Sequence, residues 1–424
     1  MSPPDASKPR AHVVGAGLAG LSCAVQLARA GRPVTLYEAA GQAGGRCRSF
    51  FDARLGRMID NGNHLLLSAN REALDYVTEI GARERLIGPP RAAFPFVDLQ
   101  SGERWTVRPN AGPIPWWIFD AGRRIPGTRP ASYLAGLRLA AAGPGDRVGD
   151  LVARSDPLWA RFWEPLTVAA LNTAPAEASA RLLWLVLRET FVRGEAACRP
   201  LIARDGLADA LVDPALALLR ERGAELCFNR RLRGFAAKDD RAMALDFPEE
   251  RVDLAADEQV VLALPPAVTG ALIPGLAVPD DSRPIVNAHI LLPGKPNLPD
   301  DLPFLGLVGG SADWIFLRGE LASLTVSAAE RLVELPNEEV ARLLWRDTAR
   351  ALGFAEDPMP PVRVIKEKRA TFAQTPEALA RRAKPRTAWH NLYLAGDWTD
   401  TGYPATIESA VRSGRAAARL VLEG

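Results

Sequence analysis

The start of the chain alternates between short apolar runs and a longer apolar repeat. Residues 11–14 form a run that is typical of a buried strand, and apolar residues then recur at helical spacing over 18–28 until Gly31. A second apolar run, residues 33–37, ends at Glu38. This pattern predicts a β-α-β unit with a turn at its first crossover.

The rest of the chain mixes both periodicities. The pattern is mostly helical from about 72 to 200, with breaks rich in proline and glycine such as 109–130. Beyond that stretch, short apolar runs predict strands and amphipathic repeats predict helices. We expect strands at 224–230, 260–264, 283–293, 303–308, 321–326 and 392–395, and helices at 207–219, at 336–352 and from about 404.

The composition is that of an ordinary globular protein, with 48% hydrophobic residues, 24% charged residues and a formal net charge of +2. At 424 residues the chain exceeds one ordinary core, so we expect about two domains. No basic run stands out, and we expect no nucleic-acid partner. The four cysteines form no CxxC and have no paired histidine nearby, which predicts no metal site and a cytoplasmic location.

The turn after the first strand carries Gly15-x-Gly17-x-x-Gly20. The first glycine permits the tight turn, the second lets the backbone approach a pyrophosphate, and the third lets helix and strand pack closely. The helix N-terminus then faces the negative charge of the phosphates. Glu38, at the end of the second strand, can accept hydrogen bonds from a ribose diol. These residues predict a dinucleotide site.

Two further motifs distinguish FAD from NAD. Gly44-Gly45-Arg46 follows Glu38 closely, and residues 392–414 read as a strand, Gly396-Asp397, a turn and a helix. This combination resembles the flavoprotein amine oxidase and phytoene desaturase superfamily, which implies an FAD-dependent oxidoreductase. The cofactor-binding residues implied by the turn and by the resemblance are Gly15, Ala16, Gly17, Leu18, Ala19, Gly20, Glu38, Ala39, Gly44, Gly45, Arg46, Asn61, Gly62, Leu232, Gly396, Asp397, Ala405, Thr406 and Ile407.

The resemblance also implies which portion of FAD some of these residues contact. Arg46 is expected near the FAD phosphates or the flavin, and Asp397 near the ribityl or phosphate portion. The backbone of residues 405–407, at a helix N-terminus, would face the flavin's pyrimidine edge, where the helix dipole stabilises an anionic reduced flavin. Leu232 would meet the adenine through its backbone.

The fold class that follows is α/β, or α+β overall, with a Rossmann-like FAD-binding domain that is discontinuous in sequence. We assign to this domain residues 1–71, 200–275 and 386–424. Residues 72–199 and 276–385 would form an inserted substrate-binding domain of sheet and helices.

Three segments narrow the family. Asp60-Asn61-Gly62-Asn63-His64, the stretch 162–173 with its Leu171-Asn172-Thr173, and the ending 396–408 resemble the squalene-associated FAD-dependent desaturases. These bacterial enzymes of hopanoid biosynthesis are also called hydroxysqualene dehydroxylases. Asn63 departs from the pattern, because glutamine is expected there, and this affects the inference of the substrate more than that of the cofactor.

The resemblance implies reduction of hydroxysqualene to squalene, an isoprenoid substrate, by hydride from N5 of reduced FAD. Departure of the hydroxyl as water needs an acid and a dry pocket. Glu164 and His64 are the leading candidates for the acid, with Asp60 and Tyr403 behind them. Aromatic residues around Glu164 favour the neutral form of a carboxyl, although a solvated glutamate and a structural histidine are the plain alternatives.

Residues 113–119, Pro-Ile-Pro-Trp-Trp-Ile-Phe, are flanked by Arg108 and by Arg123-Arg124. Aromatic side chains beside arginines suit the surface of a membrane. The segment therefore predicts peripheral contact with the inner face of the cell membrane, unless both tryptophans line a core. The electron donor is left open between a reductase and a free nicotinamide, since the chain carries one nucleotide fingerprint, and squalene-pathway enzymes are further candidate partners.

Three other functions fit some of the motifs. A carotenoid or phytoene-type desaturase would run the opposite redox direction on a similar polyene. An amine oxidase fits less well, because Trp398 and Tyr403 form no obvious aromatic cage. A lipid-binding protein of the same fold, as in Rab escort proteins and dissociation inhibitors, would lack the complete flavin site that Glu38, residues 44–46 and Asp397 indicate.

Overall fold

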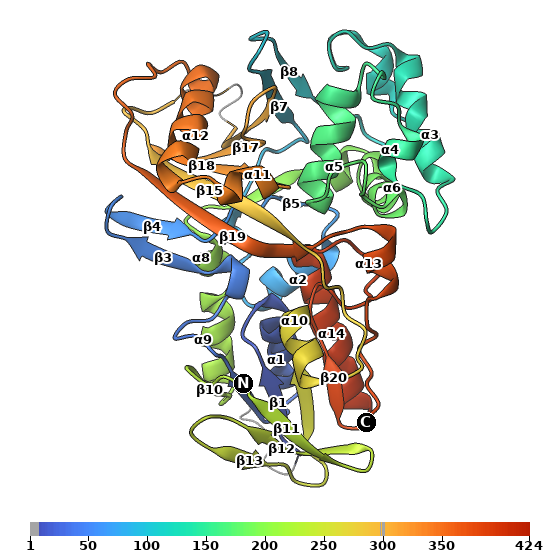
Figure 1. Ribbon diagram of the computed structural model, residues 1–424, viewed down its shortest axis with the longest axis vertical. Coiled ribbons are helices and arrows are strands. Elements are labelled where there is room, and N and C mark those ends of the chain that lie inside the picture. The colour runs from blue at the N-terminus through green and yellow to red at the C-terminus, as the bar shows by residue number, and fades with distance from the viewer. Residues whose placement is uncertain (1–7, 297, 299–301) are drawn as a thin grey trace.

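A computed structural model describes residues 8–296, 298 and 302–424 of the chain. Figure 1 shows two tiers: a parallel sheet with its helices in the lower part, and a larger, mainly antiparallel sheet with its helices in the upper part. The helices are α1 (Leu18–Arg29), α2 (Arg71–Glu79), α3 (Ala135–Ala140), α4 (Val148–Leu151), α5 (Glu164–Leu171), α6 (Ala180–Glu189), α7 (Glu195–Cys198), α8 (Leu207–Leu211), α9 (Asp213–Glu221), α10 (Pro266–Leu272), α11 (Glu330–Glu334), α12 (Asn337–Leu352), α13 (Pro376–Ala380) and α14 (Ile407–Glu423).

The parallel sheet has five strands in the order β10-β2-β1-β14-β20, and all four pairings are parallel. Four of the strands are buried along their whole length, as expected for a sheet that is covered on both faces. The strands are β1 (Ala11–Val14), β2 (Val34–Tyr37), β10 (Glu225–Cys227), β14 (Gln259–Leu262) and β20 (Leu392–Leu394).

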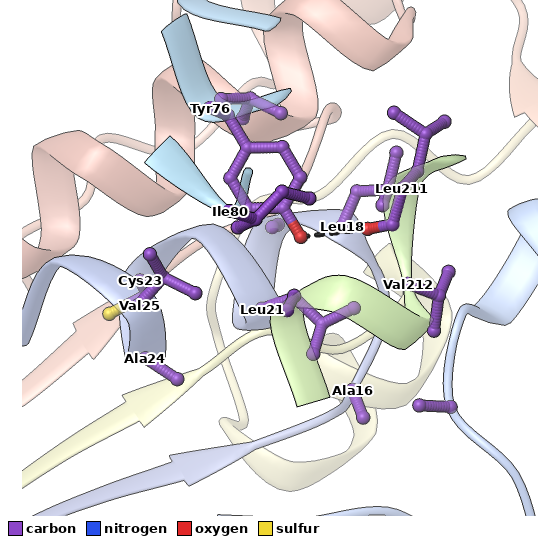
Figure 2. Close-up of a cluster of buried hydrophobic side chains, with 14 of the residues drawn as sticks. Ala16, Leu18, Leu21, Cys23, Ala24, Val25, Tyr76, Ile80, Leu211 and Val212 are labelled. Carbon is purple, nitrogen blue, oxygen red and sulfur yellow. Dashed lines mark hydrogen bonds between the residues drawn. The ribbon is translucent and has the colours of Figure 1, made fainter. Parts of the chain in front are cut away.

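Helices α1 and α14 pack against each other on one face of this sheet. A Cβ atom on Gly414 would lie 2.1 Å from the backbone oxygen of Ala19, so only glycine permits the contact. Figure 2 shows part of the cluster beside them, where the hydroxyl of Tyr76 donates to the carbonyl of Leu211 at 2.8 Å. The other face of the sheet is covered by a small antiparallel sheet of β11 (Gly234–Lys238), β12 (Arg241–Asp246) and β13 (Arg251–Asp253).

The upper sheet has seven strands in the order β19-β15-β18-β17-β16-β7-β8, antiparallel except for β16 with β7. One face packs on α11 and α12, and the other packs on the helices between α3 and α6. Its strands are β7 (Phe94–Asp98), β8 (Arg104–Val107), β15 (Ser282–Leu291), β16 (Phe304–Val308), β17 (Trp314–Arg318), β18 (Leu321–Val326) and β19 (Val362–Phe372).

Short sheets connect the two tiers. A hairpin of β3 (Ser49–Asp52) and β4 (Arg57–Asp60) leads into the 61–64 segment. Strand β9 (Pro200–Ala203) pairs with β5 (Leu66–Leu67) and with β6 (Leu86–Ile87).

The predicted α/β class, α+β overall, is confirmed, and most predicted elements fall within two or three residues of the observed ones. The stretch 72–200 is less helical than predicted, because it contains the β7–β8 hairpin. The helix predicted at 207–219 is divided into α8 and α9 at Val212, just before Pro214, since proline removes a backbone donor and favours a helix start. No described helix has the length and apolarity that crossing a bilayer requires.

Candidate functional site

The glycine turn leaves room for a ligand at the start of α1. A Cβ on Gly15 would lie 2.4 Å from the oxygen of Ala263, and one on Gly20 would lie 1.8 Å from the oxygen of Gly15. Gly17 differs, because no atom lies within 4 Å of its Cβ position, which faces open space at the N-cap of α1. Two glycines therefore serve packing and the third keeps clear the place that a pyrophosphate needs.

Glu38 closes the turn from the end of β2. Its Oε2 atom accepts from the amide of Ala16 at 2.8 Å, and its Oε1 atom accepts from the amide of Ala40 at 2.9 Å. Each carboxylate oxygen retains a second lone pair, so Glu38 can also receive a ribose hydroxyl. Leu232 is buried beside this strand, against Val14 and Tyr37.

The Gly44-Gly45-Arg46 motif packs directly on the glycine turn. The amide of Gly44 donates to the carbonyl of Ala16 at 2.8 Å, and a Cβ on Gly45 would meet the Cα of Gly17 at 3.4 Å. Arg46 Nη2 lies 2.8 Å from Asp397 Oδ1, and this carboxylate raises the pKa of the guanidinium above its usual range. The two ends of the sequence therefore meet at one ion pair beside the open turn.

The closing motif presents the N-terminus of α14. Thr406 is its N-cap, and the Thr406 hydroxyl accepts from the amide of Ser409 at 3.3 Å. The amide of Ala405 donates to Gln374 Oε1 at 2.8 Å, so Ala405 is engaged. The first amides of a helix have no partner within it, which leaves those of Thr406 and Ile407 for a ligand.

Sequence reasoning missed Gln374, which is fully buried. Its Nε2 donates to the carbonyl of Leu171 at 2.7 Å, and its own amide donates to the Thr173 hydroxyl at 3.0 Å. Asn172, between these two, has a φ of 47° and accepts the amide of Ala328 at 2.7 Å. The Leu171–Thr173 motif thus supports the cofactor site through Gln374.

Arg382 is the second residue that the sequence did not single out. It is 8% exposed, and burial lowers the pKa of its guanidinium. It donates to the carbonyls of Asp397, Trp398, Thr399 and Tyr403 and to the hydroxyl of Thr401, and it stacks on Phe372 at 5.5 Å. One cation therefore holds the whole loop between β20 and α14. The one local signal in the sequence for Arg382 is that it follows another arginine, Arg381.

Asp60, the first residue of the segment 60–64, is fully buried and anchors the segment through its carboxylate. Its carboxylate accepts from Ser49 Oγ at 2.5 Å and from the amide of Leu207 at 2.9 Å, and it pairs with Arg318. His289 Nε2 lies 2.9 Å from the carbonyl of Asp60. These partners occupy the carboxylate and favour an anchoring role for Asp60 over that of a proton donor.

The next three residues, Asn61, Gly62 and Asn63, contact the upper sheet. Asn61 Nδ2 donates to Glu367 Oε2 at 3.3 Å, and Asn63 Nδ2 donates to Thr325 Oγ1 at 3.1 Å. A Cβ on Gly62 would lie 3.4 Å from Asn287 Nδ2. The segment is therefore fixed against β15, β18 and β19 of the upper sheet, and Asn63 has a packing role there.

The other acid candidates differ in availability. Burial, together with the charge of Arg46, lowers the pKa of His64 to about 4, so its imidazole is neutral at pH 7. Glu164 is half-buried at the start of α5, and no described residue pairs with its carboxylate. The Tyr403 ring lies under the Arg412 guanidinium at 4.2 Å. The catalytic roles stay predictions, with Glu164 the most available acid of the four.

The comparisons with known proteins agree with this site. The family model described as flavin containing amine oxidoreductase matches residues 18–422. The hydroxysqualene dehydroxylase of Rhodopseudomonas palustris is 48% identical over 97% of this chain and 98% of its own length. That of Sinorhizobium fredii is 46% identical with the same coverage, whereas a probable zeta-carotene desaturase of Synechococcus elongatus is 23% identical.

Solved structures show the same fold. A putrescine oxidase, in a structure with bound putrescine, superimposes with a TM-score of 0.72 at 15% identity, covering 98% of this chain and 99% of that one. The chain belongs to the flavin containing amine oxidoreductase family and, within it, to the group of the hydroxysqualene dehydroxylases. FAD is its cofactor, and the open space at Gly17, the carboxylate of Glu38 and the free amides of α14 fit such a group.

Loss of Glu38 or of Asp397, the two carboxylates of the proposed FAD site, should deplete the protein of flavin. Glu38→Ala removes the ribose acceptor, and Asp397→Ala removes the partner of Arg46. We expect each purified variant to hold less than about a tenth of the wild-type flavin, measured by visible absorbance. Asp400→Ala, an exposed carboxylate three residues on, is the control that should stay yellow. Full occupancy in both cradle variants would refute the assigned roles.

Arg382→Met should weaken flavin binding at least about tenfold, because several buried carbonyls lose a charged donor at once. Arg381→Met is the matched control, since Arg381 pairs with Asp280 on the surface at 2.6 Å. Flavin release followed by fluorescence, together with the far-ultraviolet circular dichroism of both variants, separates a cofactor effect from misfolding. Equal flavin affinity in the two variants would contradict the role of Arg382.

Proposed function

We propose that this protein catalyses the FAD-dependent reductive dehydroxylation of hydroxysqualene to squalene. The observation that carries the proposal is the 48% identity to a hydroxysqualene dehydroxylase over 97% of the chain. The motifs that suggested this group, 60–64, Leu171–Thr173 and 396–408, all contribute to one site, which supports the assignment further.

The reaction replaces a carbon–oxygen bond with a carbon–hydrogen bond. When bound in its reduced form, FAD supplies the hydride. The hydroxyl takes up a proton and departs as water. The residues of this chain bind the cofactor, exclude water and hold the proton that the hydroxyl takes up. The N-terminus of α14 stabilises negative charge on the adjacent flavin.

The pocket for a polyprenyl chain is expected in the apolar cluster between the upper sheet and helices α3–α6. Its aromatic members include Phe94, Trp159, Trp163, Phe304 and Phe316. An allylic cation that forms as the hydroxyl leaves is protected from water in such surroundings. Leu171 belongs to this cluster, and its carbonyl is bound by Gln374, which also binds the amide of Ala405, so the apolar region adjoins the proposed cofactor site.

Glu164 is our proposed proton donor. It lies about 10 Å along α5 from Leu171, given the rise of 1.5 Å per residue, and it stands between Trp163 and Pro165 at the edge of the apolar cluster. Asp60 is occupied by three donors, and His64 is neutral. A half-buried carboxyl without a partner is the group best suited to exchange protons with a substrate.

Two further parts of the proposal concern partners. The reaction consumes two electrons, so a reductase or a free nicotinamide must regenerate reduced FAD. A squalene-like substrate is concentrated in membranes, and we propose that the protein takes it from the inner face of the cell membrane. A phytoene-type desaturase is the weaker alternative, since the zeta-carotene desaturase match is half as identical as the dehydroxylase matches.

Anaerobic incubation of the photoreduced protein with hydroxysqualene should yield squalene, identified by gas chromatography with mass detection. One squalene should form per flavin in a single turnover. Unchanged hydroxysqualene, with turnover on phytoene or on an amine instead, would overturn the proposal. The oxidised protein is the control and should give no squalene.

Glu164→Gln should retain its flavin and lose turnover by about 100-fold or more, the usual contribution of a general acid. The amide keeps the size of the side chain and cannot donate the proton. Glu221→Gln, a change to an exposed carboxylate at the end of α9 that has no partner among the described residues, is the control. Wild-type turnover in Glu164→Gln would remove Glu164 from the mechanism.

A further inference from the structure

Large apolar side chains are unevenly exposed on this protein. In the described part of the chain, five of the twelve large hydrophobic residues named as exposed lie within a span of 24 residues. Their exposed fractions run from 52% to 65%. These five side chains, which we call the Trp116 patch, are Ile114, Trp116, Phe119, Leu134 and Leu137.

The patch is built by two short helical segments packed together. The turns η3 (Trp116–Phe119) and η4 (Pro130–Leu134) meet where the ring of Tyr133 contacts that of Trp117 edge-on at 5.2 Å. Trp117 is buried, whereas Trp116 is 61% exposed and lies 6.0 Å from the Phe119 ring. The sequence pattern is compatible with two core tryptophans, but in the structure only Trp117 is buried and Trp116 faces outward.

Helix α3 also has one buried and one exposed apolar side. Leu139 is fully buried and Leu137 is 65% exposed, two residues apart on one turn of helix. Figure 1 shows α3 at the outer edge of the upper tier, away from the parallel sheet. The exposed apolar side chains therefore lie on segments that also bury Trp117 and Leu139 against the protein.

The surroundings of the patch are cationic. Residues 108–140 contain five arginines and one aspartate, whereas the whole chain has a net charge of only +2. Arg129 and Arg138 are both exposed, and Arg138 directly follows Leu137 in the sequence. A partner for this surface must therefore accept aromatic and aliphatic side chains and carry negative charge. An anionic lipid bilayer has both properties.

The patch also has a direct relation to the proposed pocket. The buried halves of η3 and α3, Trp117 and Leu139, belong to the same apolar cluster as Trp159, Trp163 and Leu171. The exposed face and the region beside the cofactor site are thus the outer and inner sides of one apolar body.

We propose that the Trp116 patch is a docking surface for anionic lipid bilayers. Trp116, Phe119, Leu134 and Leu137 enter the headgroup region, and the arginines around them meet lipid phosphates. The purpose of such docking, delivery of a hydrocarbon substrate, rests on the proposed function. The evidence for it is the exposure and charge of the patch. Attachment of this kind is reversible and weakens as salt screens the arginines.

Co-sedimentation of the flavin-loaded protein with vesicles tests this surface. We expect the wild type to pellet with phosphatidylcholine vesicles containing 30% phosphatidylglycerol, and to bind pure phosphatidylcholine at least about tenfold more weakly. The double variant Trp116→Ser, Phe119→Ser should lose about tenfold or more of the anionic-vesicle binding. The control Phe51→Ser, Met58→Ser removes two equally exposed apolar side chains elsewhere and should bind as the wild type.

Several outcomes would overturn the proposal. Wild type that stays in the supernatant with anionic vesicles is one, and undiminished binding by the patch variant is another. A third is a wild-type dimer in size-exclusion chromatography that becomes a monomer in the patch variant without any vesicle binding, because the patch would then join two copies.

The result is separable from that of the proposed function. With hydroxysqualene dissolved in detergent, the patch variant should form squalene at the wild-type rate, since it retains the cofactor site. If neither protein forms squalene but only the wild type binds vesicles, the docking surface stands and the proposed function falls.

Discussion

The contact between α1 and α14 is the constraint on which the cofactor site depends. The two helices come from opposite ends of the sequence, and Gly414 lets α14 approach the carbonyl of Ala19 more closely than any other residue would permit. The N-terminus of α1 lies at the open turn around Gly17, which we propose holds the pyrophosphate, and that of α14 lies at Thr406, which we propose faces the flavin. A fixed crossing of the helices would therefore set the distance between the proposed pyrophosphate and flavin positions.

Around this contact, buried polar side chains join the two tiers. A buried carboxylate is stable only when it is paired and hydrogen-bonded, and Asp60 satisfies this through Ser49, Leu207 and Arg318. These partners come from β3, α8 and β17, so one charge connects the hairpin, the lower tier and the upper sheet. Arg382 does the same for the loop before α14. Asp60 and Arg382 are thus satisfied by segments that are distant in the sequence or in the fold.

The sequence predicted the elements with a clean apolar period and missed those without one. Four of the five strands of the parallel sheet are short, mainly apolar runs, and α12 and α14 have clear helical repeats. Strand β19 was missed because charged residues from Arg363 to Arg369 interrupt its alternation. The β7–β8 hairpin was missed because it lies between helical stretches and its partner strand, β16, lies 210 residues further along the chain.

The same reasoning explains which site residues were found. Glu38, the glycines and Asp397 belong to local motifs whose spacing has a physical cause. Gln374 and Arg382 act through hydrogen bonds to segments that are remote in sequence, such as Leu171, or adjacent only through a loop, such as Thr399. No local pattern marks such residues. The sequence suggested Asp60 and His64 as candidates, but their surroundings, which lower the pKa of His64 and occupy the carboxylate of Asp60, are a property of the folded chain.

The placement of β20 at the edge of the parallel sheet has a consequence for biosynthesis. A ribosome makes the glycine turn first and residues 392–423 some 370 residues later, so the nascent chain carries an incomplete cradle for most of its synthesis. Translation proceeds at about 5–20 residues per second, so this interval lasts tens of seconds. The complete FAD site therefore forms only after residues 392–423 have been made, and most of the synthesis proceeds without its C-terminal half.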